Sequence, residues 1–122
     1  MDKKMNTTID FEFYDGSTAK LTLFFYALYQ LKEKNKSLYE RCNRIMTKGT
    51  EDVLEMITML YTAYCAANID DYENLMSEEE FMFKCGSDIK AVAEAVKQLM
   101  SPKKQKASGN RSSKEREPEN KG

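Results

Sequence analysis

One stretch, from Thr50 to Asn68, constrains the fold of this chain more than any other part of its sequence. On a 3.6-residue helical period it is apolar around most of its circumference, and only a narrow strip is polar. The apolar positions are Val53, Leu54, Met56, Ile57, Met59, Leu60, Tyr61, Ala63, Tyr64, Cys65 and Ala67, and the polar strip is Glu55, Thr58 and Thr62. Such a helix must be covered by several neighbours, or partly by a partner. The stretch therefore predicts the central helix of a small bundle.

Length and charge divide the chain into one domain and a tail. A chain of 122 residues suits a single small domain with a modest core. Residues 1–100 hold 12 Lys and Arg against 17 Asp and Glu, whereas residues 101–122 hold 7 against 3. From Lys103 to Gly122 there is no Leu, Ile, Val, Met or aromatic residue, so burial cannot offset the entropy lost on ordering. We predict a domain over residues 1–102 and a disordered basic tail over 103–122.

Strict alternation of apolar and polar residues near the N-terminus predicts a β-hairpin with one apolar face. A two-residue loop at Asp15-Gly16 would place apolar side chains of one strand opposite polar side chains of the other. A three-residue loop of Tyr14, Asp15 and Gly16, with Gly16 in the left-handed region, brings the apolar faces of the two strands together. It sets Phe11 opposite Ala19 and Ile9 opposite Leu21.

Helical periodicity predicts four more helices, over residues 24–34, 37–48, 77–85 and 88–100. Ser37 and Ser77 begin capping-box sequences, Thr50 is expected to cap the central helix and Ser87 or Asp88 the last helix, and Gly49 and Gly86 are expected to end helices. Three inner faces are expected: Phe24, Ala27, Leu28 and Leu31; Leu38, Cys42, Ile45 and Met46; and Ile89, Val92, Ala93, Val96, Leu99 and Met100. The predicted fold is α+β but mainly α, with the hairpin packed on four or five helices.

Catalytic, cofactor and metal chemistry find no support in the sequence. Histidine is absent, and each glycine of the folded part is explained by a turn or a helix end. The acidic stretch at residues 70–80 lacks the alternating ligands and central glycine of a calcium-binding EF-hand loop. We therefore expect a protein that is not an enzyme and holds no cofactor or metal.

Cysteine usage and hydropathy indicate a protein of the cytoplasm. Cys42, Cys65 and Cys85 fall in helix-like apolar patterns, as expected of small buried hydrophobes in a reducing compartment. The longest apolar run, Leu23–Tyr29, is too short to span a membrane, and no secretory signal is visible. We expect no membrane partner.

Methionine and tyrosine, eight and seven residues respectively, are abundant for so small a core. Methionine adapts to irregular partners, and tyrosine offers rigid contact area with a polar tip, so the composition favours protein binding over catalysis. A methionine-rich face would also permit a homo-oligomer. The candidate partner-binding residues are Tyr26, Tyr29, Met56, Met59 and Ala63, as the wall of a groove beside the central helix. Replacing Met59 by Glu is then expected to abolish binding while helix content stays intact.

Three runs carry a resemblance to a known family: TTIDFEFYDGSTAKLTLFFYALYQLKEKNKSLYERCNRIMTKG, EDVLEMITMLYTAYCAANID, and MSEEEFMFKCGSDIKAVAEAVKQL followed by PKKQ. Over residues 7–105 the chain resembles the tail assembly chaperones of long-tailed bacteriophages and prophages of Gram-positive bacteria. The resemblance implies a small, mostly helical protein of the host bacterial cytoplasm that is absent from the mature virion. It also implies binding to the hydrophobic, helical tape measure protein, which is kept soluble, and help in delivering the tail tube protein.

A second hypothesis is a small nucleic-acid-associated regulator that acts through the basic tail. The tail has Lys and Arg for phosphates, but no aromatic residue for base stacking, and Glu115, Glu117 and Glu119 interrupt its positive charge. Nucleic acid is therefore the weaker of the two partner predictions. Salt dependence separates them, because phosphate binding weakens steeply with salt whereas apolar docking does not.

Overall fold

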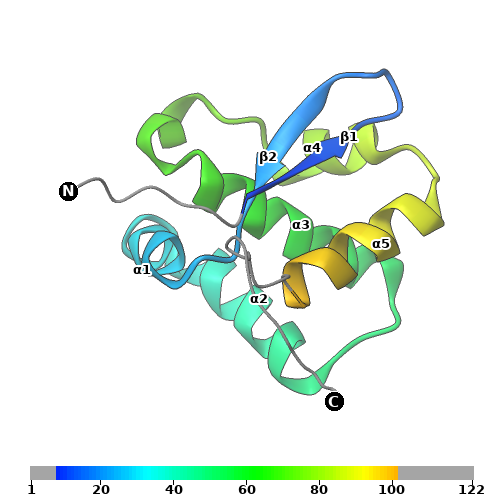
Figure 1. Cartoon of the computed structure of the whole chain (residues 1–122). Coiled ribbons are helices and arrows are strands. Elements are labelled where there is room, and N and C mark those ends of the chain that lie inside the picture. The colour runs from blue at the N-terminus through cyan, green and yellow to red at the C-terminus, as the bar shows by residue number, and fades with distance from the viewer. Residues whose placement is uncertain (1–7, 102–122) are drawn as a thin grey trace, which may run out of the picture.

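The computed structural model describes residues 8–101 as an antiparallel hairpin followed by helices (Figure 1). The elements are β1 (Ile9–Glu12), β2 (Thr18–Leu21), α1 (Phe25–Lys34), α2 (Lys36–Lys48), α3 (Val53–Ala67), the 3-10 helix η1 (Ile69–Asn74), α4 (Glu78–Cys85) and α5 (Ile89–Met100). This order confirms the predicted α+β, mainly α fold. The predicted disordered tail, residues 103–122, lies outside the described residues.

The hairpin has the predicted register and loop. Phe11 lies opposite Ala19, and Ile9 lies opposite Leu21. The Phe13 N–H donates to the Ser17 carbonyl over 2.7 Å and closes a loop of three residues, in which Gly16 has a φ of 88°. Only glycine adopts this left-handed conformation without a steric penalty, so Gly16 determines which faces of the two strands coincide.

Helix α3 is the central element, as its composition predicts. It contacts β2, α1, α2, η1, α4 and α5, and Figure 1 shows it running through the middle of the molecule with the hairpin above and α2 below. The polar strip is not the exposed side of α3, because Thr58 and Thr62 are buried whereas Leu54 is exposed. Thr62 donates its hydroxyl proton to the Thr58 carbonyl over 2.7 Å, so its burial leaves no donor unsatisfied.

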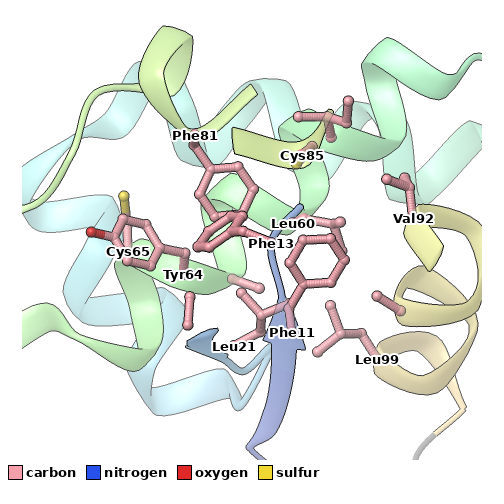
Figure 2. Packing of buried hydrophobic residues seen from close by; sticks show 14 of the residues in the cluster. Phe11, Phe13, Leu21, Leu60, Tyr64, Cys65, Phe81, Cys85, Val92 and Leu99 are labelled. Atoms are coloured by element: carbon pink, nitrogen blue, oxygen red, sulfur yellow. The ribbon is translucent and has the colours of Figure 1, made fainter. Parts of the chain in front are cut away.

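Aromatic rings from three elements meet at the centre of the core (Figure 2). The Phe81 ring of α4 has its centroid 5.2 Å from that of Phe13, 5.3 Å from that of Tyr64 and 5.6 Å from that of Tyr61. Phe11 stacks on the same ring with a centroid separation of 6.4 Å. Phe81 therefore joins the apolar face of the hairpin to α3.

Two predicted helix starts are wrong, and two are confirmed. Asn35, not Ser37, caps α2 by accepting from the Leu38 N–H, and Asp52, not Thr50, caps α3 by accepting from the Leu54 N–H. Ser77 caps α4 as predicted, and Asp88, one of two predicted candidates, caps α5. Gly49 and Gly86 end α2 and α4 as predicted.

The buried stripe of α5 differs from the predicted one at both of its ends. Val92, Ala95 and Leu99 are buried, whereas Ile89 and Met100 are exposed. Positions three and four residues apart lie on one helical face, so Val92, Ala95 and Leu99 form a narrower stripe than the six predicted residues.

Candidate partner-binding surface

The connection from β2 to α1 turns a set of aromatic side chains outward. Leu21 is buried, and the Thr22 N–H donates to the Ala63 carbonyl over 3.1 Å, which attaches this connection to the central helix. The Thr22 hydroxyl oxygen in turn accepts from the Phe24 N–H over 3.1 Å. Helix α1 then begins at Phe25 and buries Ala27, Leu28 and Leu31. Because residues 26 and 29 fall on the opposite side of a 3.6-residue helix, they face away from the bundle, and Phe25 at the first position of α1 is also exposed.

Four residues form what we call the aromatic face: Phe24, Phe25, Tyr26 and Tyr29. Phe25 is 87% exposed, Tyr29 59% and Tyr26 53%. The rings of Tyr26 and Tyr29 stack with a centroid separation of 6.0 Å and an interplanar angle of 27°. Clustered exposed aromatic side chains are typical of interaction surfaces, since single exposed apolar residues are common but contiguous ones are not.

The five predicted partner-binding residues do not lie on one surface. Tyr26 and Tyr29 are together on the aromatic face, whereas Met56 is half-buried against the main core. Met59 is 3% exposed and packs with Cys42 and Ile45 of α2, and Ala63 is fully buried. Met59 and Ala63 therefore hold helices together and cannot contact a partner unless those helices separate.

The expectation that Met59→Glu leaves helix content intact conflicts with this burial. A carboxylate at this position would have to lose its hydration shell among apolar side chains, which costs several kcal/mol. The substitution would destabilise the domain whether or not the protein binds a partner. Variants on the aromatic face test binding without this complication.

Phe25 is the exposed residue that sequence reasoning missed. The predicted inner face of this helix, including Phe24, left Phe25 without a role, although Phe25 is the first residue of α1 and is 87% exposed. Phe24 itself precedes the helix and is partly exposed. Helical periodicity gives no clear signal for this exposure, because Phe25 lies three residues before the buried Leu28.

A polar cluster of Arg41, Thr58 and Glu78 joins three helices, α2, α3 and α4. The Arg41 guanidinium of α2 donates to both carboxylate oxygens of Glu78 over 2.8 and 3.3 Å, and the Thr58 hydroxyl of α3 donates to Glu78 over 2.9 Å. The hydrogen bonds from Arg41 lower the pKa of Glu78 against the opposing effect of burial, and the Thr58 bond adds to them. The carboxylate is thus held ionised and fully bonded, which suits a structural role and leaves no free base.

Three tyrosines hold the segment between α3 and α4 on the domain. The Tyr61 hydroxyl donates to the Met76 carbonyl over 2.9 Å, and the Tyr64 hydroxyl oxygen accepts from the Met76 N–H over 3.1 Å. The Asn35 side-chain amide donates to the Tyr72 hydroxyl over 2.9 Å and so ties η1 to the end of α1. Tyr72 thus pins the acidic connection to the body, and Leu75 also packs against the core.

The cysteines are buried and unpaired, as predicted for small hydrophobes. Burial raises the pKa of the Cys65 and Cys85 thiols to about 11 and also raises that of Cys42, so all three remain protonated at neutral pH. Across residues 8–101, no group of three or more Cys, Asp or Glu side chains is placed to hold a metal ion. In the same part of the chain, no helix is both long and apolar enough to cross a membrane.

Comparison with known proteins identifies no relative: no family model matches the chain, and neither a curated protein nor a solved structure is significantly similar to it.

Proposed function

We propose that this protein is a tail assembly chaperone of a long-tailed bacteriophage or prophage. In this role it binds the tape measure protein without chemical conversion, keeps it soluble in the host cytoplasm and promotes assembly of the tail tube. It leaves before the virion is complete. The observation that supports a binding role is the aromatic face of α1, which is exposed on a domain with an otherwise well-filled core.

The aromatic face suits an apolar helix better than a small ligand. Phe25 and Tyr29 are four residues apart, and Tyr26 and Tyr29 are three apart, so their side chains form a ridge along α1. Such a ridge packs into the groove between the side chains of a second helix. Burying one phenylalanine ring is worth about 1.5–3 kcal/mol relative to its exposure, so a few such anchors can hold an apolar segment reversibly.

Co-expression with a tape measure segment from the same genome tests the proposal. The segment alone is expected to be insoluble, and with this protein it is expected to co-elute at both low and high salt. Phe25→Ser is expected to weaken binding by about thirtyfold, which corresponds to about 2 kcal/mol for a buried aromatic anchor.

Phe83→Ser is the matched control, because Phe83 is 71% exposed on α4, far from α1 in the chain. It makes the same chemical change and should leave co-elution unchanged. The proposal fails if the segment stays insoluble, or if Phe25→Ser and Phe83→Ser weaken binding equally. Recovery of nucleic acid at low salt, in place of the segment, would favour the regulator hypothesis instead.

A further inference from the structure

The two-stranded hairpin has an open edge along β1. In an antiparallel pair, every second residue directs its N–H and C=O groups toward the partner strand, and the residues between direct theirs away from it. The Phe13 N–H donates to the Ser17 carbonyl, so Phe13 and, by alternation, Phe11 pair with β2. The backbone groups of Asp10 and Glu12 therefore point away from β2, on a side where residues 8–101 form no third strand (Figure 1).

The opening is limited to two residues. Beyond Glu12, the Tyr14 N–H donates to the Lys84 carbonyl of α4 over 3.1 Å, so the loop end of this edge is closed. The other strand, β2, is attached to α3. Within the described part of the chain, the outward N–H and C=O groups of Asp10 and Glu12 have no hydrogen-bond partner. Such a row of unpaired backbone groups is a template for another strand.

The solvent face of β1 is acidic at the same two residues. Asp10 and Glu12 are exposed, and the residue between them, Phe11, points into the core, so no cation of β1 separates the two carboxylates. Lys20 of β2 pairs with Asp10 over 2.9 Å, which shows that a cation on a neighbouring strand reaches this row. Glu12 lies opposite Thr18 and takes part in no salt bridge among residues 8–101. A strand added at the open edge would therefore meet one paired and one unpaired carboxylate.

We infer that β1 binds an extended, basic segment of a partner protein as a third strand of the sheet. Backbone hydrogen bonds to Asp10 and Glu12 supply the affinity, because an extended peptide can pair with an exposed sheet edge. Lys or Arg at alternate positions of the segment lies beside the two carboxylates, and cross-strand pairs of opposite charge are favourable. The site lies on β1, not on the aromatic face of α1, and does not rest on the proposed function.

Charge disfavours a second copy of this chain as the occupant. Antiparallel pairing of two β1 edges through both open residues would set Asp10 of each copy opposite Glu12 of the other. Like charges directly opposite each other on neighbouring strands destabilise a sheet. A basic segment replaces both repulsions by attractions.

A synthetic peptide with Lys and Val at alternate positions tests the inference on the full chain. Its binding is measured by fluorescence anisotropy, and amide hydrogen exchange of the protein is followed by NMR. Exchange at Asp10 and Glu12 is expected to slow about tenfold in the complex, because a hydrogen-bonded amide exchanges only when the bond opens. A peptide with Glu in place of Lys is expected to bind about three- to tenfold more weakly.

Methyl groups on the peptide backbone separate strand pairing from charge attraction. The Lys residues that lie beside the carboxylates direct their N–H groups toward β1, so N-methylation of these residues should abolish binding. N-methylation of the Val residues, whose N–H groups point away from β1, is the matched control and should preserve binding. Glu12→Gln should reduce the preference for the Lys peptide, whereas Glu51→Gln, an exposed residue between α2 and α3, should not.

Equal binding of the two N-methylated peptides, or of the Lys and Glu peptides, would overturn the inference. Slow exchange at Asp10 and Glu12 in the free protein would also overturn it. If that protection is present at every concentration, residues of this chain outside 8–101 cover the edge, and if it requires high concentration, a second copy does. Phe25→Ser should leave peptide binding unchanged, since a loss would place the peptide on the aromatic face and not on β1.

Discussion

Removal of the Phe81 ring is expected to destabilise the domain severely. This ring is fully buried, and its neighbours are rings of the hairpin and of α3 (Figure 2). Its centroid lies 5.2 Å from that of Phe13 and 5.3 Å from that of Tyr64. Phe81→Ala would leave a cavity where three elements meet, and none of them can close it without moving away from the others.

The size of the loss follows from the burial and the ring contacts. Phenylalanine-to-alanine substitutions in protein cores cost about 3–5 kcal/mol. Because Phe81 also forms edge-to-face aromatic pairs, we expect the cost of Phe81→Ala to lie toward the upper end of this range. At about 0.05–0.15 kcal/mol per residue, a domain of this size has a free energy of unfolding of about 5–14 kcal/mol. The single substitution is thus expected to remove about a third or more of it.

Urea denaturation followed by far-ultraviolet circular dichroism measures the effect. With a slope of about 1–2 kcal/mol per molar urea, a loss of about 4 kcal/mol lowers the midpoint by about 2–4 M. Phe83→Ala is the control, because it makes the same change two residues further along α4, where the ring is exposed and contacts only Tyr14 among the aromatic rings. It should cost less than about 1 kcal/mol. Equal losses in the two variants would refute the argument that Phe81 joins the hairpin to α3.

Two further predictions concern a backbone position and an ion pair. Gly86→Ala should destabilise the domain more than Gly49→Ala does, as measured by the urea midpoints of the two variants. Both glycines have a positive φ, but a Cβ on Gly86 would lie 3.1 Å from the Tyr14 Cβ, whereas a Cβ on Gly49 would face open space. Glu78→Gln should cost about 1 kcal/mol at pH 7, because its carboxylate bonds to the partly exposed Arg41. Because these bonds lower the pKa of Glu78 below its ordinary 4.5, the wild-type advantage should be complete above pH 4.5 and vanish as pH falls through the lowered pKa; an advantage that persists in acid would contradict this.

The hairpin could be predicted in detail because its sequence offers one consistent solution. Side chains alternate strictly along a strand, so Ile9 and Phe11 must share a face with Ala19 and Leu21. Only a loop with an odd number of residues satisfies that condition, and Gly16 supplies the left-handed residue that such a loop requires. Local geometry alone therefore determined the register.

The helix starts were less predictable because neighbouring residues compete for the same role. Asn35 and Ser37 can both cap a helix, and Asn35 also donates to Tyr72, a contact distant in sequence. Thr50 is a good cap by type, but its hydroxyl accepts from the Asp52 N–H and donates to Glu55, so Asp52 caps α3. Contacts between residues distant in sequence determine which residue caps the helix, and those contacts cannot be read from the sequence.

Helical periodicity located the central helix but misplaced its exposed side. Thr58 and Thr62 are buried because their hydroxyl groups find partners in the Glu78 carboxylate and the Thr58 carbonyl. Once satisfied, a threonine packs as a small β-branched residue, and Leu54 at the start of α3 is exposed instead. The prediction of five binding residues failed in part for the same reason, since Met59 and Ala63 lie on a side of α3 that the fold covers.

Departures from the usual burial pattern therefore have two different meanings in this chain. The buried threonines are explained inside the domain, because each polar atom has a partner there. The exposure of Phe25 on α1 is not explained inside the domain. Its ring is almost fully exposed, and a polar residue would serve the helix equally well at that position. Consistent sequences break local rules mainly where function requires it, and an exposed aromatic ridge carries a risk of aggregation. A partner helix that covers Phe25 would remove that risk and would explain why α1 presents its aromatic rings to solvent.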